Sequence, residues 1–320
     1  MNHPPISVVL VTYNSERHLA ECLSSVTWAD ELVVVDLQSN DRTLEIARSF
    51  GCRVLSHAWV AIVEMVRQEA IGECKYEWIL MLDPDEIVPP ALAERMRAIA
   101  ASGEADAVSI PWKNYIFGQW MRYSGWNGDR HTRFFRKGTV HYPKDVHSGE
   151  RTDGRILRLP DEEPYYIIHL NYDTVEQFVE KLNRYTTLEV EKLAGQPNQN
   201  NVGEMVRAPF REFRRRYFDE LGFRDGLQGL AACELMAFYW AVVSLKKAER
   251  DGWVVPAGWP QTLADVRLGL WSGMLDLLVA MERTADNRLQ RVVVRLVRGT
   301  VGLVRRLRAR SARLKGRVAE

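Results

Sequence analysis

The first hundred residues alternate short apolar runs with segments of helical spacing, and this alternation constrains the fold more than any other feature. Short alternating strands and helices predict a parallel, doubly wound α/β sheet. The apolar runs lack period-2 alternation, which is typical of strands covered by helices on both faces. The expected strands are Ile6–Thr12, Glu31–Asp36, Arg53–Leu55 and Trp78–Leu82, and the expected helices are Ser15–Val26, Asp41–Phe50 and Val60–Ile71.

The fourth apolar run ends in an acidic turn, Asp83-Pro84-Asp85, which Glu86 follows. Crowded carboxylates at the end of a buried strand repel one another unless a cation lies among them, and no lysine is close by in the sequence. Mg²⁺ and Mn²⁺ take oxygen ligands and commonly join a carboxylate to a substrate diphosphate. In parallel α/β sheets, ligands bind at the carboxyl ends of the strands. The alternative is an acidic turn that caps a helix opening at Pro89-Pro90-Ala91.

Polar residues also follow the other predicted strands. The hydroxyl and amide groups of Thr12-Tyr13-Asn14-Ser15-Glu16 suit the base and ribose of a nucleotide, and the backbone amides that open the next helix suit an anion. Asp36 can accept a hydrogen bond from a ribose hydroxyl or a base N–H. Arg67 and Gln68 precede the acidic strand and can approach a diphosphate. Taken singly, each group also has a structural interpretation, as a helix cap or as part of a solvated helix face.

Taken together, these segments resemble the nucleotide-sugar-binding half of the family 2 inverting glycosyltransferases, which have the GT-A fold. The residues that carry the resemblance are Val8–Asn14, Val33–Thr43 and Leu80–Glu86. Further segments are similar to the branch that includes the lipopolysaccharide-core β-glucosyltransferases, and the likeness extends to about Glu191. These segments are Cys22–Val26, Trp28–Glu31, Arg133–Arg136 with Val146-His147, and Asn171-Tyr172 with Lys181–Tyr185.

The resemblance implies a direct displacement at the anomeric carbon of a nucleotide-diphosphate sugar, most simply a UDP-sugar. A metal, Mg²⁺ or Mn²⁺, carries the charge on the leaving diphosphate in such a step. Asp85 is the expected metal ligand, with Asp83 and His147 as further ligands. The residues expected to contact the nucleotide sugar are Thr12, Tyr13, Asn14, Glu16, Asp36, Gln38, Asp41, Arg67, Gln68, Asp83, Arg133 and Arg136.

The same displacement needs a base that takes the proton of the acceptor hydroxyl. Asp129 is the favoured candidate because it follows Gly125-Trp126-Asn127-Gly128, a glycine-containing aromatic loop suited to closing over a sugar. Glu150 and Asp145 are the alternatives. Asp129 also has a plain structural interpretation, as a turn residue after Gly128.

The pattern after residue 106 divides the chain into two expected domains. Residues 1–195 form the α/β glycosyltransferase domain, which ends with a helix over 173–193. Residues 196–320 form a helical region with interruptions at 222–229 and 251–260.

The C-terminal segment is strongly basic and amphipathic. From Arg288 onward, ten arginines and Lys315 face a single acid, Glu320, and on a helical wheel the arginines lie opposite a Leu/Val stripe. Such a helix is typical of an anionic membrane surface. Packing on the protein's own core and binding of nucleic acid are the alternatives. The apolar stretches 230–245 and 268–281 suit shallow insertion, a helical core or a homo-oligomer interface, and we expect neither to span a membrane.

Composition narrows the class of protein and its compartment. The 43 basic and 42 acidic residues nearly balance, so no nucleic-acid partner is expected. The four cysteines form no C-x-x-C pair, and the N-terminus does not resemble a signal peptide, which favours the cytoplasm. We therefore expect a peripheral enzyme on the cytoplasmic face of the membrane that glycosylates a lipid-linked or cell-envelope glycan acceptor.

Three rival hypotheses remain at this point. A synthase of the same fold that uses polyprenyl phosphate as acceptor needs a basic site, which residues 207–216 can supply. A non-catalytic nucleotide-binding or scaffold protein would function without Asp85. A nucleic-acid-binding module would depend on the basic tail.

Overall fold

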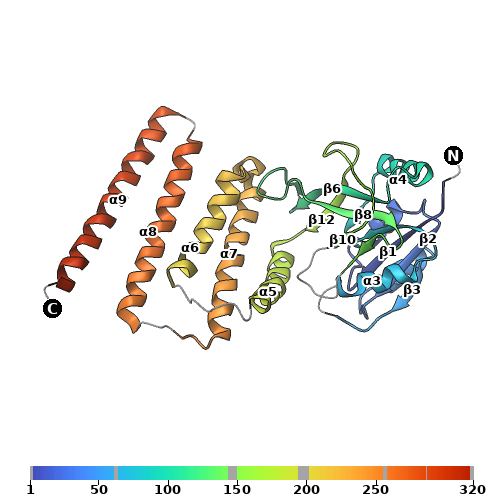
Figure 1. Ribbon diagram of the computed structural model, residues 1–320, viewed down its shortest axis with the longest axis horizontal. Helices are drawn as coiled ribbons and strands as arrows, with labels where there is room; N and C mark the ends of the chain where they lie inside the picture. The colour runs from blue at the N-terminus through green and yellow to red at the C-terminus, as the bar shows by residue number, and fades with distance from the viewer. Residues whose placement is uncertain are drawn as a thin grey trace. The chain divides into compact units, whose positions relative to one another are not determined.

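The computed structural model describes residues 3–60, 64–142, 150–193, 202–254, 258–285 and 287–317, with side chains up to residue 302. The chain divides into two compact units (Figure 1). The first comprises Met1–Trp120 and Trp126–Asp173, and the second comprises Met121–Gly125 and Thr174–Glu320. The helix α5 (Val175–Lys192) is therefore grouped with the C-terminal helices. The domain boundary at residue 195 remains a prediction.

The first unit is built on a mixed sheet whose strand order is β3-β2-β1-β4-β8-β6-β12-β5. The strands β1 (Ile6–Thr12), β2 (Glu31–Asp36), β3 (Arg53–Ser56) and β4 (Trp78–Leu82) are parallel to one another, as the sequence predicts. This arrangement confirms the expected α/β class. Because the four strands run in one direction, the acidic turn after β4 and the polar loops after β1 and β2 emerge at the same edge of the sheet.

The second half of this sheet contains both strand directions. Strand β8 (Arg130–Arg136) is antiparallel to both β4 and β6 (Ala107–Ile116), and β12 (Ile167–Tyr172) is parallel to β6. The remaining strands are short: β5 (Glu86–Ile87), β7 (Gln119–Trp120), β11 (Ile156–Arg158), and a separate pair of β9 (Val140–His141) and β10 (Arg151–Thr152). The pairing of β5 with β12 brings the acidic turn beside a strand from the end of the unit.

Helices cover both faces of the parallel strands, which explains their uninterrupted apolar runs. Ile6, Val8 and Leu10 of β1 pack with buried residues of α1 (Leu19–Ser25), α2 (Thr43–Ser49) and α4 (Pro90–Ser102). Val9 and Val11 of the same strand pack with α3 (Glu64–Glu73) on the other face. The first predicted helix starts later than expected, since 14–18 form a connection that hydrogen-bonds to the loop after β2.

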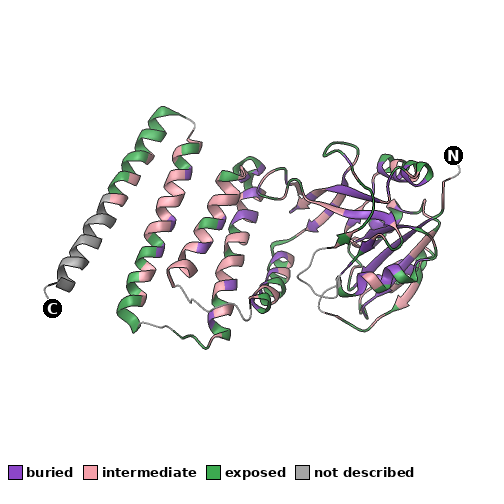
Figure 2. Ribbon diagram, viewed as in Figure 1, coloured by how far each residue is buried: buried purple, intermediate pink, exposed green. Residues whose placement is uncertain are grey.

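The second unit is helical. Its long elements are α5, α6 (Val202–Phe213), α7 (Gly226–Arg250), α8 (Gly258–Thr284) and α9 (Arg288–Arg317), with a π-helical turn η1 (Arg214–Asp219) and a 3₁₀ turn η2 (Gly222–Asp225) between α6 and α7. Helix α6 packs against α7 and α8, α5 against α7, and α8 against α9. Residues of α8 and the described part of α9 are mostly exposed or half-buried (Figure 2).

Among the described residues, the helical segment Gly222–Arg250 is long enough and apolar enough to cross a membrane, by length and composition alone. It contains the apolar stretch 230–245, which was not expected to span a membrane, and that expectation remains a prediction.

Candidate functional site

The acidic turn after β4 is closed by its own hydrogen bonds. The backbone N–H of Asp83 donates to Glu86 Oε2 at 2.9 Å, and the N–H of Glu86 donates to the carbonyl oxygen of Asp83 at 3.0 Å. The carbonyl oxygen of Asp85 accepts from the N–H of Leu170 in β12 at 2.8 Å. The turn is therefore fixed on both sides. It is not the cap of α4, which begins after Pro89 without a side-chain cap.

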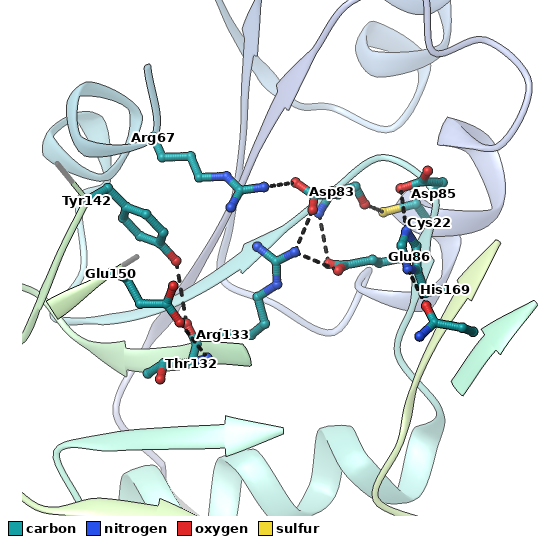
Figure 3. Close-up of polar contacts among 11 residues, drawn as sticks. Cys22, Arg67, Asp83, Asp85, Glu86, Thr132, Arg133, Tyr142, Glu150 and His169 are labelled. Atoms are coloured by element: carbon teal, nitrogen blue, oxygen red, sulfur yellow. Dashed lines mark hydrogen bonds and ion pairs between the residues drawn. The ribbon is translucent and has the colours of Figure 1, made fainter. Parts of the chain in front are cut away.

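Two arginines that are distant in sequence neutralise Asp83 (Figure 3). Arg67 from α3 lies 2.6 Å from Asp83 Oδ1, and Arg133 from β8 lies 2.5 Å from Asp83 Oδ2. Arg133 also lies 2.8 Å from Glu86 and is almost fully buried. The neutralising cations are thus two arginines, both predicted to contact the nucleotide sugar, rather than a lysine close to the turn in the sequence. Because both guanidinium groups are bound to Asp83, the case for metal binding at the turn rests on Asp85.

Burial and charge act in opposite directions on the two paired acids. Burial disfavours the ionised form of Asp83, but Arg133 and Arg67 together hold the pKa of Asp83 well below its usual range. Burial, with the charges of Asp83 and Asp85, raises the pKa of Glu86 to about 8 against the opposing effect of Arg133. The surroundings therefore favour the ionised form of Asp83 and oppose ionisation of its neighbour Glu86.

Asp85 begins a chain of polar side chains that ends at Asp129. His169 Nε2 of β12 lies 3.7 Å from Asp85 Oδ1, and His169 Nδ1 lies 2.8 Å from Asn114 Oδ1. The amide nitrogen of Asn114 donates to Asp129 Oδ2 at 3.1 Å and to the carbonyl oxygen of Trp126 at 3.0 Å. The metal candidate and the base candidate are therefore connected through two side chains.

This chain determines the tautomer of His169. Both contacts of the Asn114 amide nitrogen are to acceptors, so the Asn114 oxygen faces the imidazole and His169 Nδ1 must donate. In the neutral ring, Nε2 then presents a lone pair toward the carboxylate of Asp85. Two basic atoms that face each other at 3.7 Å suit a shared divalent cation, and donation from the other ring nitrogen is the usual arrangement for a metal-binding histidine.

The described residues contain no group of three or more His, Cys, Asp or Glu side chains arranged around a metal. Asp85 and His169 provide two donors, and diphosphate oxygens and water are the usual remaining ligands of Mg²⁺ in such sites. The predicted ligand His147 lies outside the described residues, as does the alternative base Asp145.

The loops after β1 and β2 are joined by hydrogen bonds. The buried carboxylate of Asp36 accepts from Thr12 Oγ1 at 3.0 Å and from the Ser39 N–H at 2.9 Å. The Asn14 side chain accepts from the Asn40 N–H at 2.9 Å. Asp41 accepts from the Glu16 N–H, and Glu16 accepts from the Arg42 N–H, both at 3.0 Å.

These contacts show how the predicted nucleotide residues are held. They link two loops, so the simple helix-cap interpretation does not account for them. Asn14 and Gln38 are exposed and have positive φ of 46° and 64°, so the chain turns sharply in both loops. Tyr13, which is 39% exposed, makes an edge-to-face contact with Trp59 at 6.4 Å between ring centroids. The edge of the sheet therefore carries a fixed polar frame beside two exposed aromatic rings.

Three other predicted residues lie in different surroundings. The side chain of Gln68 accepts from the Tyr142 N–H at 3.0 Å, next to the acidic cluster. Glu150 accepts weakly from the Thr132 N–H at 3.5 Å. Arg136 does not join the cluster: it pairs with Glu77 at 2.7 Å, and β8 places it opposite Trp78 at the amino end of β4, away from Asp83.

Sequence reasoning missed His169 and Asn114. Both are buried polar residues in strands β12 and β6, whose other inward residues are mainly apolar. The only signal in the sequence was a polar residue at alternate positions of an apolar strand, in Ile167–Tyr172. Their meeting depends on the register that pairs His169 with Asn114 across two strands.

Residues 7–159 match the family model described as glycosyl transferase family 2. This part of the chain is a family 2 glycosyltransferase domain. The match confirms the resemblance inferred from the strand–turn motifs. The domain includes the acidic turn, the loops after β1 and β2, and Asp129, and His169 lies just past it.

Relatives of known name match most of the chain. The lipopolysaccharide core biosynthesis glycosyltransferase LpsC of Rhizobium meliloti is 24% identical over 254 residues, covering 77% of this chain and 93% of LpsC. The uncharacterized glycosyltransferase RT0209 of Rickettsia typhi is 24% identical over 252 residues, covering 73% and 83%. Among solved structures, residues 1–349 of S. aureus TarS have a TM-score of 0.42 at 17% identity, covering 78% of this chain and 92% of that one.

Proposed function

We propose that the protein is a metal-dependent, inverting glycosyltransferase that moves a sugar from a nucleotide-diphosphate donor, with UDP as the nucleotide, to a lipid-linked or cell-envelope glycan. The observation that carries the proposal is the fixed turn Asp83–Glu86 at the carboxyl end of β4 in a family 2 domain, with Asp85 facing His169 at 3.7 Å. Ligands bind at this edge in parallel α/β sheets.

Donor binding is assigned to the residues around this edge. The frame formed by Thr12, Asn14 and Asp36 presents polar groups to the base and ribose, and Tyr13 offers an aromatic face. The carboxylate of Asp36 already accepts from Thr12 and Ser39, which holds it in position for a further donor from the nucleotide. The role of Arg67 follows from its place at the turn, since its side chain is still 11% exposed and can reach a diphosphate.

The divalent ion is assigned to Asp85 and His169. When bound, it supplies positive charge to the leaving diphosphate. The nitrogen donor favours Mn²⁺ over Mg²⁺, because Mg²⁺ prefers oxygen ligands. Arg67 and Arg133 pair with Asp83, so Asp85 is the favoured ligand of the two aspartates. His147 and Asp83 remain weaker candidates for the same role.

Asp129 is assigned as the base. Asp129 is half-buried, and the Asn114 amide donates to Asp129 Oδ2 at 3.1 Å, which holds the carboxylate at the end of the glycine-containing loop that was expected to close over a sugar. The inverting course follows from a single displacement with one base. Glu150, which Thr132 holds only weakly, is the alternative.

The acceptor is assigned from two considerations. The relative LpsC is by its name a lipopolysaccharide core enzyme, and the helical unit carries an exposed apolar face and a basic helix suited to a membrane surface. The polyprenyl-phosphate alternative is not favoured, because the arginines that it requires are paired with acids: Arg207 with Asp276, Arg211 with Glu204, and Arg216 with Glu212.

The test is a donor screen with a panel of nucleotide sugars in Mg²⁺ and in Mn²⁺. Wild-type protein is expected to turn over one donor, and Asp85→Asn is expected to lose most of that turnover, by about 10²-fold or more. Asp153→Asn, which makes the same change at an exposed acid paired with Arg151, serves as the matched control. Full activity of Asp85→Asn in excess EDTA would refute the metal assignment. A protein that binds a nucleotide sugar but turns over none would indicate the scaffold hypothesis.

A further inference from the structure

Five residues beside the proposed base pack with the helical unit. Met121–Gly125 lies between β7 and the loop that carries Asp129, and it is grouped with Thr174–Glu320 although the residues on both sides of it belong to the first unit. Met121 and Ser124 in this segment are fully buried. The helical unit therefore holds the chain at the point where the Asp129 loop begins.

Asp225, at the end of η2, provides the central contacts. Its Oδ1 accepts from the Arg122 N–H at 3.1 Å, and its Oδ2 accepts from the Tyr123 N–H at 3.0 Å and from Ser124 Oγ at 2.8 Å. Asp225 as a residue is 2% exposed. Hydrogen bonds to an ionised acceptor are roughly twice as strong as neutral ones, so three of them fix this segment firmly.

The turns that precede Asp225, η1 and η2 with their connection, enclose the same segment. The Ser124 N–H donates to the Glu220 carbonyl oxygen at 3.1 Å, and Arg216 Nη1 donates to the Ser124 carbonyl oxygen at 2.7 Å. A Cβ atom at Gly222 would lie 2.9 Å from Ser124 Oγ and 2.7 Å from the Arg216 carbonyl oxygen. Backbone and side chain of Ser124 are thus held from several directions within the helical unit.

Only Trp126-Asn127-Gly128 separates this held segment from Asp129. Gly125 and Gly128 have positive φ of 75° and 82°, so the loop turns sharply at both. At its far end, Asn114 binds the Trp126 carbonyl oxygen and the Asp129 carboxylate. We propose that Asp225 is a positioning residue, which sets the position of Asp129 by fixing Met121–Gly125. The inference rests on the proposed role of Asp129 as the base.

A purely structural role for Asp225 predicts a different result from a positioning role. If Asp225 only stabilises the helical unit, its loss lowers the melting temperature and leaves the turnover of folded enzyme unchanged. If it positions Asp129, the folded enzyme keeps its KM for the donor and loses kcat. A misplacement of about 1 Å costs on the order of 10²-fold in rate.

The experiment uses the full chain and three graded variants. Ser124→Ala removes one of the three donors, Asp225→Asn keeps the shape but removes the charge, and Asp225→Ala removes all three contacts. Hydrogen exchange of the amides in 122–129 and steady-state kinetics are measured on each. Asp219→Asn is the control, since this acid of the neighbouring turn pairs with Arg214 and is 38% exposed.

Exchange in 122–129 is expected to increase from Ser124→Ala to Asp225→Ala. The kcat is expected to fall in the same order, by about tenfold or more for Asp225→Asn, with donor KM within about twofold. Unchanged exchange in 122–129, or faster exchange with unchanged kcat, would overturn the inference. Asp129→Asn is measured in parallel. If Asp129→Asn turns over normally, the base assignment is wrong, and the positioning role of Asp225 is wrong with it. Hydrogen exchange in 122–129 still tests separately whether Asp225 fixes Met121–Gly125.

Discussion

The side-chain amide of Asn114 forms hydrogen bonds with two candidate site residues, His169 and Asp129. Because its nitrogen is committed to Asp129 and Trp126, its oxygen imposes the Nδ1-protonated form on His169. The hydrogen bond from the same amide also fixes the orientation of the Asp129 carboxylate. At the scale of single residues, therefore, one amide side chain joins the two candidates, His169 and Asp129, and orients both of them.

Asp129→Asn is expected to lower turnover by about 10²–10⁴-fold, the usual contribution of positioned proton transfer, with little change in donor affinity. Initial rates and donor binding are measured on the same preparation. Glu150→Gln is the matched comparison, because Glu150 accepts only a weak hydrogen bond from Thr132. Normal turnover of Asp129→Asn together with loss of activity in Glu150→Gln would transfer the role to Glu150.

His131 is expected to make stability depend on pH. Burial, with the charge of Arg133, lowers the pKa of His131 to about 3. The unfolded chain then binds a proton near pH 6.5 that the folded protein binds only near pH 3, so the free energy of unfolding falls as pH decreases through this range. The slope from this residue approaches about 1.4 kcal/mol per pH unit.

Urea denaturation at several pH values between about 4.5 and 7 measures this slope. The ring centroids of His131 and Trp112 are 3.9 Å apart. His131→Phe keeps an aromatic ring at this position and is expected to flatten the dependence of the free energy of unfolding on pH. His141→Gln should keep the wild-type slope, since that ring is 46% exposed. Equal slopes for wild type and His131→Phe would show that His131 is not kept neutral by the fold.

At the scale of elements, the parallel half of the sheet could be predicted from the sequence, and little of the other half could. Strands β1, β2 and β4 are recognisable because their apolar runs are buried largely or completely, whereas the short edge strand β3 was found from its place in the alternation. The turn Asp83–Glu86 was found because it follows the buried run of β4. The contacts of Arg133 and His169 were not predictable, because they depend on β8 lying between β4 and β6 and on β12 pairing with β5. The contacts of Asp225 were likewise not predictable, because they depend on the grouping of Met121–Gly125 with the helical unit while the residues on both sides belong to the first unit.

The packing of α8 on α6 depends on two glycines. A Cβ atom at Gly269 would lie 2.5 Å from the Gly203 carbonyl oxygen, and one at Gly273 would lie 2.6 Å from Phe210 Cγ. Gly273→Ala should therefore separate the two helices locally and lower the free energy of unfolding by about 1–3 kcal/mol. Thermal unfolding measures this change. Gly299→Ala, on α9 with nothing within 4 Å, should be neutral or stabilising by up to about 1 kcal/mol. Equal effects of the two changes would contradict the close packing.

At the scale of the whole molecule, the two kinds of side chain on the basic helix α9 lie in different surroundings. Arg295 and Arg298 each lie 2.8 Å from Glu282 on α8, so part of the arginine stripe pairs with the protein itself. The apolar stripe is directed outward: Leu289 and Leu296 are 73% and 66% exposed. Exposed leucines on a basic helix are costly in water and favourable at a membrane surface. Packing on α8 and binding to lipid are therefore compatible.

Truncation after residue 286 is expected to release the protein from anionic vesicles and to weaken use of a lipid-linked acceptor. Hydrolysis of the soluble donor should persist, because the proposed site lies in the first unit. Charge attraction is screened over about 10 Å at 0.1 M salt, so binding of the full chain should weaken as salt rises without vanishing. The matched control is Leu289→Ser with Val293→Ser and Leu296→Ser, which keeps every arginine. It should bind at low salt and detach at high salt, because only the inserted apolar area resists screening. Vesicle binding that is equal for the full and truncated chains at both salt concentrations would leave α9 as a packing element of the helical unit.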